Sequence, residues 1–180
     1  PVESYLTEGI WRIVLSAGKI VTGQYEMWLP SDNVLNRGTG FLFPTDATTL
    51  TIPSSASRAI SVGAYDAWTF AYADFSGIGV TRLTNMVKPD LVAPGVNVRT
   101  TAVGGGVTVV SGTSFATPFV TGASALLMEW GIVRGNDPFL YGEKVKAYLR
   151  RGARELPGFG KYPNREVGYG RLCLERSLPD

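Results

Sequence analysis

The sequence contains no histidine among its 180 residues and only one cysteine, Cys173. Without histidine, the chain cannot supply the imidazole that hydrolases most often use as a general base. A single cysteine excludes an intrachain disulfide, and the lack of histidine excludes a Cys/His zinc site. Cys173 lies between Leu172 and Leu174, so we interpret it as a small buried apolar residue rather than a reactive thiol. The sequence indicates no metal and no cofactor.

Charge is also scarce. Charged residues make up 18% of the chain and the formal net charge is +2, so no strong field attracts nucleic acid or an anionic membrane. We find neither a signal peptide nor an apolar run of transmembrane length, and we predict no membrane partner. The first residue is Pro1 rather than Met. Targeting signals upstream therefore stay open, and cytosol, spore and secretion all fit.

Hydrophobic residues account for 44% of the chain, which is enough for a buried core, and they fall into two zones. Residues 1–56 show the alternation of β-strands at 11–15 and 25–28, with a third apolar run at 41–43. Glycines and prolines separate these runs as turns. Short strands of this kind are typical of an antiparallel sandwich. Because too few are present to close one, we expect part of it to precede Pro1.

Residues 57–180 follow the pattern of an α/β domain. Short apolar runs at 59–64 and 91–93 predict buried parallel strands. Further strands are expected at 96–101 and 107–110, where β-branched residues are frequent. Strands followed by helices in this order predict a sheet covered by helices.

Two helices are expected in this second zone. Apolar residues repeat at three or four positions from 115 to 130, and Gly131 is expected to end the helix. The remaining faces are apolar too, so this helix belongs in the centre of a large domain. A second helix is predicted from Asp137 and Pro138, an N-cap and first-position pair, to Gly152.

The run Ser-Gly-Thr-Ser-Phe-Ala-Thr-Pro at residues 111–118 stands at the start of the long helix. Gly112 permits a tight approach of the backbone before the helix. Ser114 then lies at the helix N-terminus, where its Oγ can attack a carbonyl and its own N–H can donate to the developing oxyanion. Alternatively, Thr113 or Ser114 serves only as an N-cap. The whole run, followed by an apolar helix, favours a nucleophile.

Residues 112–118 resemble the segment around the nucleophilic serine of subtilisin-like serine proteases, the subtilases. Further segments are similar to that family and follow its order: 60–64, 74–77, 88–96 and 168–172. The resemblance implies a subtilisin-like α/β fold, with a parallel sheet and a central helix, that is incomplete in this chain. Residues 57–180 would form the C-terminal part of the catalytic domain.

The N-terminal zone resembles a different element of the family. Residues 9–11 and 23–30 are similar to the jelly-roll insert of clostridial subtilases, the Csp proteases of spore germination among them. This implies that residues 1–56 are part of an antiparallel β jelly-roll.

The departures from the family pattern concern the catalytic partners of the serine. The family's catalytic aspartate and histidine, and the asparagine of its oxyanion hole, lie N-terminal to the serine, and none has a recognisable counterpart here. Asp66 and Asp74 are therefore not assigned as catalytic, and the resemblance implies a structural role for Asp90. A lysine base is disfavoured, because the candidates lie on segments that the family uses for turns and outer helices: Lys88, Lys144 and Lys146.

The resemblance implies the C-terminal part of a subtilisin-like serine endopeptidase. Ser114 would attack a carbonyl of a protein or peptide substrate, a histidine of the N-terminal portion would take its proton, and an aspartate would orient that histidine. The Ser114 N–H and an asparagine of that portion would hold the oxyanion. We therefore expect the N-terminal portion of the same protease as a partner, and negligible activity from this chain alone. Its substrate-binding residues stay unknown.

Two other functions fit the sequence. The first is a pseudoprotease that uses the fold as a binding or signalling module, and an intact Ser114 disfavours it. The second is a stand-alone structural or interaction domain, which predicts a stable monomer with cooperative unfolding.

Overall fold

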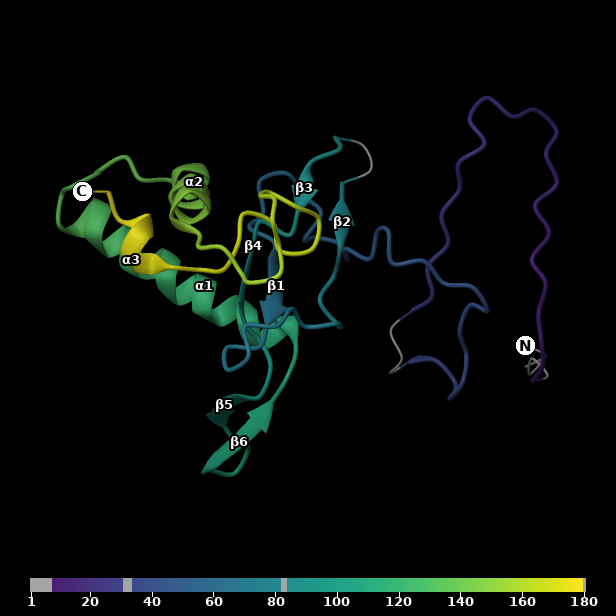
Figure 1. Ribbon diagram of the computed structural model, residues 1–180, viewed down its shortest axis with the longest axis horizontal. Coiled ribbons are helices and arrows are strands. Elements are labelled where there is room, and N and C mark those ends of the chain that lie inside the picture. The colour runs from purple at the N-terminus through teal and green to yellow at the C-terminus, as the bar shows by residue number, and fades with distance from the viewer. Residues whose placement is uncertain (1–7, 31–33, 82–83, 180) are drawn as a thin grey trace, which may run out of the picture. The chain divides into compact units, whose positions relative to one another are not determined.

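The computed structural model describes residues 8–30, 34–81 and 84–179 (Figure 1). The chain forms two compact units, Pro1–Pro44 and Thr45–Asp180. The boundary between them falls earlier than the one expected after residue 56, so that residues 45–56 belong with the larger unit.

The first unit has no β-strand or α-helix at residues 8–30 or 34–44. The strands expected at 11–15, 25–28 and 41–43 do not form there, and large apolar side chains such as Ile10 and Trp11 stay exposed. A sandwich strand needs a neighbour that pairs its backbone and covers its apolar face. The jelly-roll is not confirmed by this structure and stays a prediction.

The second unit carries the strands. Where the structure describes it, they pair as three two-stranded sheets. The pairs are β1 (Val62–Tyr65) with β4 (Leu91–Pro94), β2 (Gly79–Val80) with β3 (Val87–Lys88), and β5 (Val98–Thr101) with β6 (Val107–Val110).

The parallel pair of β1 and β4 forms the centre of this unit. Val62 lies opposite Leu91, and the backbone of Arg171 continues the parallel pairing beside Val92. Ala64 and the first three residues of β4 are completely buried, as expected for a parallel sheet covered on both faces. The predicted parallel strands at 59–64 and 91–93 are therefore confirmed within a few residues.

The long helix α1 (Thr113–Met128) packs against β1 and β4 (Figure 1). Its small residues Ala116, Val120 and Ala123, together with Leu127, form the buried face. The other faces, expected to be buried too, are open to solvent in this chain. By length and composition the segment Thr113–Val133 could also cross a membrane, but the core helix of a globular domain meets the same criteria.

Gly131 does not end the helix, contrary to the sequence expectation. The chain continues through one π-helical stretch, η2 (Glu129–Val133). Gly131 is buried within it, and a Cβ there would lie 2.8 Å from Leu140 Cδ2. Gly131 therefore serves close packing rather than termination.

The second helix, α2 (Gly142–Gly152), begins later than predicted. Asp137 does not cap it. Instead its carboxylate accepts hydrogen bonds from Lys144 Nζ at 2.6 Å and from the Tyr148 hydroxyl at 3.0 Å. The helix ends at Gly152 as expected, and a short helix, α3 (Leu174–Ser177), packs beside it. Cys173, just before α3, is half-buried rather than buried.

Candidate active site

Ser114 lies in the first turn of α1 and is exposed. The backbone before it is fixed by a close contact with the sheet. Gly112, the N-cap, has φ +152° and donates its N–H to the carbonyl of Gly95 at 2.8 Å. Gly95 follows β4 and donates in turn to the carbonyl of Tyr65, at the end of β1, at 3.0 Å. The carboxyl ends of both central strands therefore position the turn that carries Ser114.

The first turn of α1 can stabilise negative charge. The first N–H groups of an α-helix have no acceptor within the helix, and the helix dipole is positive at this end. No acidic side chain lies in the first turn of α1 to neutralise that potential. Thr117 Oγ1 donates a hydrogen bond to the carbonyl of Thr113 at 3.0 Å. The hydroxyl of Ser114 takes no part in this hydrogen bond. A carbonyl oxygen approaching Ser114 would thus meet a positive potential.

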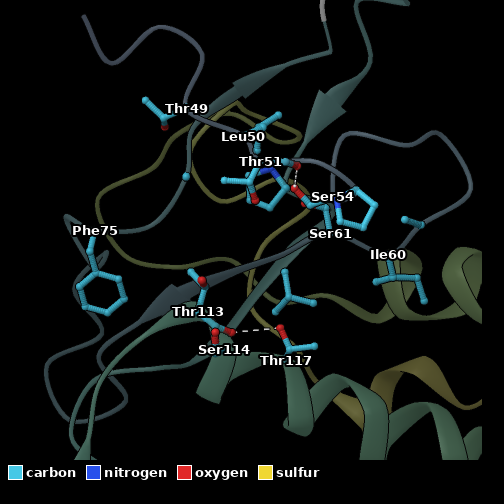
Figure 2. A pocket seen from close by; sticks show the side chains of 15 residues that line it. Thr49, Leu50, Thr51, Ser54, Ile60, Ser61, Phe75, Thr113, Ser114 and Thr117 are labelled. Carbon is cyan, nitrogen blue, oxygen red and sulfur yellow. Dashed lines mark hydrogen bonds between the residues drawn. The ribbon is translucent and has the colours of Figure 1, made fainter. Parts of the chain in front are cut away.

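A cavity of about 440 Å³ opens beside Ser114 (Figure 2). Its wall includes Thr49, Leu50, Thr51, Pro53 and Ser54 from the segment before β1. Ala59, Ile60 and Ser61, with Val62 of β1, form a second part of the wall. Figure 2 shows Thr113, Ser114 and Thr117 at the side opposite Thr51 and Ser54. A cavity of this size accommodates a side chain or part of a peptide.

None of the three unassigned aspartates lines this cavity. Asp66 Oδ1 accepts the backbone N–H of Trp68 at 2.8 Å, an ordinary turn contact. Asp74 is exposed, and Asp90 is completely buried. Within the residues that the structure describes, no group of three or more Cys, Asp and Glu side chains is placed to hold a metal ion.

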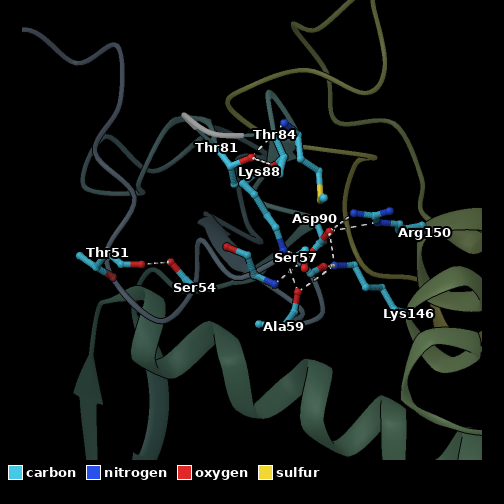
Figure 3. Close-up of polar contacts among 12 residues, drawn as sticks. Thr51, Ser54, Ser57, Ala59, Thr81, Thr84, Lys88, Asp90, Lys146 and Arg150 are labelled. Carbon is cyan, nitrogen blue, oxygen red and sulfur yellow. Dashed lines mark hydrogen bonds and ion pairs between the residues drawn. The ribbon is translucent and has the colours of Figure 1, made fainter. Parts of the chain in front are cut away.

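Asp90 is the centre of a buried charge network (Figure 3). Its Oδ2 accepts hydrogen bonds from the N–H of Ser61 at 2.7 Å and from Lys88 Nζ at 2.9 Å. Its Oδ1 accepts from Arg150 Nε at 3.0 Å and lies 3.2 Å from Lys146 Nζ. Burial by itself would raise the pKa of Asp90, but the hydrogen bonds from Lys88, Ser61 and Arg150 hold it below the ordinary value of 3.8.

Lys146 belongs to the same network and departs from its ordinary chemistry. Burial lowers the pKa of Lys146 to about 8, although the charge of Asp90 opposes this shift, and the neighbouring Lys88 lowers it further. Sequence reasoning placed Lys146 on an outer helix and assigned it no part in a site. Lysine is almost never fully buried. The sequence around Lys146 therefore gives no signal that its side chain is buried.

The family of the chain is shown by its similarity to known proteins. The profile of the Subtilase family matches residues 13–170. This chain is a subtilase. The matched range includes the turn before Ser114 and the parallel pair of β1 and β4. The sequence resemblance and the subtilisin-like α/β class are both confirmed.

Solved and curated subtilases agree with this assignment. The structure of the CspB protease of Clostridium perfringens is 49% identical, superposes with a TM-score of 0.75, and matches 79% of this chain and 30% of that one. The mouse membrane-bound transcription factor site-1 protease is 37% identical over 134 residues, covering 72% of this chain and 12% of the relative. Serine protease AprX of Bacillus subtilis is 32% identical over 154 residues, covering 74% and 33%. The chain spans at most a third of each relative.

Proposed function

We propose that this chain is the serine-bearing C-terminal part of an active subtilisin-like serine endopeptidase, with Ser114 as its nucleophile. The observation that carries the proposal is the position of Ser114, exposed in the first turn of α1 and on the wall of a cavity. Membership in a family of serine proteases supports it. The substrate is a protein or peptide, the class on which the related proteases act.

The chemistry follows from the residues at the helix N-terminus. Ser114 Oγ attacks a peptide carbonyl carbon, and the proton of the hydroxyl passes to a histidine of the N-terminal portion. The carbonyl oxygen becomes an oxyanion, which accepts a hydrogen bond from the N–H of Ser114 and a second from an asparagine of that portion. The tetrahedral adduct expels the amine, which takes the histidine proton, and water then hydrolyses the acyl-serine ester. This chain alone lacks the base and has negligible activity.

The exposed side of α1 supports a partner that covers it. Phe119 is 44% exposed and Leu126 is 52% exposed, on a helix that is otherwise apolar. A Cβ added to Gly122, which lies between them, would meet no atom within 4 Å. This leaves room for another element to approach closely. We call Phe119, Gly122 and Leu126 the outer face of α1. The N-terminal portion of the same protease is the occupant we propose, because the matched part of this chain covers at most a third of each of these relatives.

The test is covalent labelling of the reassembled protein. The chain is combined with the N-terminal portion of the same protein and treated with a fluorophosphonate, which reacts with activated serines. We expect labelling of Ser114, and none in Ser114→Ala or in the chain alone. Ser124→Ala removes a serine of the same helix, whose hydroxyl donates to the Val120 carbonyl at 2.7 Å, and should label like the wild type.

The opposite result would point to the alternative function. If the reassembled wild type does not react, Ser114 has no base and the proposal is wrong. A residue other than histidine at the base position of the N-terminal portion would then indicate a pseudoprotease that acts by binding.

A further inference from the structure

The cavity wall next to β1 is held largely by side chains, beside one backbone hydrogen bond from the N–H of Asp90 to the carbonyl of Ser61 at 2.8 Å. Residues 57–59 form bends, and residues 57–61 contain no strand or helix. The carbonyl of Ser57 accepts a hydrogen bond from Lys146 Nζ at 2.8 Å, and the carbonyl of Ala59 accepts from both Lys146 Nζ at 2.8 Å and Lys88 Nζ at 2.7 Å. The N–H of Ser61 donates a hydrogen bond to the carboxylate of Asp90. We call residues 57–61 the network-held wall.

Lys146 has the central position among these contacts. An ammonium group has three N–H donors. In Lys146 they meet two carbonyl oxygens of the network-held wall and Oδ1 of Asp90. The lysine belongs to α2, and the two carbonyls lie 89 and 87 residues earlier in the chain. Lys146 therefore ties the helix α2 directly to a wall of the cavity and to Asp90, the residue before β4 (Figure 3).

Fold stability is a poor explanation for a charged lysine here. Three cations surround one carboxylate: Lys88 from β3, and Lys146 and Arg150 from α2. Lys88 and Arg150 already satisfy Asp90, and burial of a third cation is unfavourable, which is why the pKa of Lys146 is lowered to about 8. The contacts that only Lys146 makes are those to the wall, above all to the Ser57 carbonyl.

The network-held wall faces the nucleophile across the cavity. Ala59, Ile60 and Ser61 line the same cavity as Ser114. We propose that Lys146 is a positioning residue that fixes the network-held wall, and thereby sets how tightly a substrate side chain binds beside Ser114. This inference rests on the proposed function, because it assigns the cavity to substrate. It adds a specificity-determining role for a residue that touches neither substrate nor serine.

The test compares three variants of the complete protein. Lys146→Met keeps the aliphatic stem and removes the ammonium. Lys146→Arg keeps a charged donor group. Lys144→Met is the matched control, because Lys144 lies on the same helix, pairs with Asp137 at 2.5 Å and does not contact the wall. Two quantities are measured: hydrogen exchange of peptides covering residues 57–61, and KM and kcat for peptide substrates.

For Lys146→Met we expect exchange of the wall to become about tenfold faster and KM to rise about tenfold, with kcat within about twofold. Lys146→Arg should restore both to within about threefold of the wild type, and Lys144→Met should change neither. A purely structural role would instead lower the unfolding temperature and leave KM and wall exchange unchanged, and that result overturns the inference.

The exchange measurement separates this inference from the proposed function. If the complete protein has no turnover, the proposed function fails. Hydrogen exchange of residues 57–61 then tests the positioning role by itself. A wild-type exchange rate in Lys146→Met overturns that role. Faster exchange in Lys146→Met, returned to near the wild-type rate in Lys146→Arg, supports it.

Discussion

Replacing Gly95 by alanine should move the turn that carries Ser114 away from the sheet. A Cβ on Gly95 would lie 2.6 Å from the Cβ of Ala64 and 3.0 Å from the carbonyl oxygen of Gly112. It would also lie 3.3 Å from the Cβ of Ala116. Carbon atoms pack at about 3.5–4.0 Å. All three neighbours are backbone or Cβ atoms, which no rotamer change can move, so β1 and the start of α1 must separate.

The magnitude follows from that geometry. Overpacking of a close-packed core costs about 1–3 kcal/mol, and the rigid neighbours place this site near the upper end. For a chain of 180 residues each kcal/mol lowers the unfolding temperature by about 2–4 °C. The separation also displaces Ser114, and a shift of about 1 Å at a reacting group can cost about 100-fold in rate. We expect both a lower unfolding temperature and labelling by the fluorophosphonate slowed about 100-fold.

Gly142→Ala is the matched control. Gly142 is the first residue of α2, and its built Cβ meets nothing within 4 Å. Alanine there should leave the unfolding temperature unchanged or raise it slightly, because it favours helix by up to about 1 kcal/mol. Wild-type unfolding and wild-type labelling in Gly95→Ala would refute the reasoning, since the three close contacts would then have no consequence.

Three further outcomes are expected. Asp90→Asn should lower the free energy of unfolding at neutral pH by about 3–5 kcal/mol, because it leaves buried cations without a counter-charge. The folded pKa of Asp90 lies below 3.8, so denaturation titrations should show the wild-type advantage above pH 3.8 and its loss as pH falls through the folded pKa. The pKa of Lys146 is about 8 in the folded chain and 10.5 in the unfolded chain. Between these pH values the unfolded chain therefore binds more protons than the folded one. The free energy of unfolding of the wild type should rise with pH in this range, relative to that of Lys146→Met. In the chain alone, Leu127→Ala should cost about 2–5 kcal/mol, and Leu126→Ala, on the outer face of α1, should cost under about 1 kcal/mol yet weaken reassembly with the N-terminal portion.

Local patterns in the sequence predict the central elements well. The strand at 107–110 has the predicted bounds, and those at 59–64 and 91–93 shift by only a few residues. The helix of the serine run begins at Thr113, two residues before the first position of the apolar repeat, and its N-cap is Gly112. These elements follow from apolar runs and from short-range signals that act within a few residues, and such signals are visible in one dimension.

The errors arise where a distant contact overrides a local rule. Gly131 has the sequence signature of a helix end, but it is packed against Leu140 and lies inside a continuing helix. Asp137 has the signature of an N-cap, but its carboxylate binds Lys144 and Tyr148 instead. Helix propensities and caps contribute about 1 kcal/mol each, which tertiary packing can exceed.

By itself, the sequence predicts Ser114 as the nucleophile, and it determines that any histidine base must come from outside these 180 residues. It also indicates the family, because the serine run and the other similar segments follow one another in the family's order. Only the tertiary structure shows the cavity wall and the network of Asp90, Lys88 and Lys146. Lys88 and Asp90 are near neighbours in the chain, but Lys146 lies on a later helix, and all three residue types are ordinarily found on the surface. Their burial and the 2.8 Å contacts of Lys146 exist only when α2 packs beside the central strands.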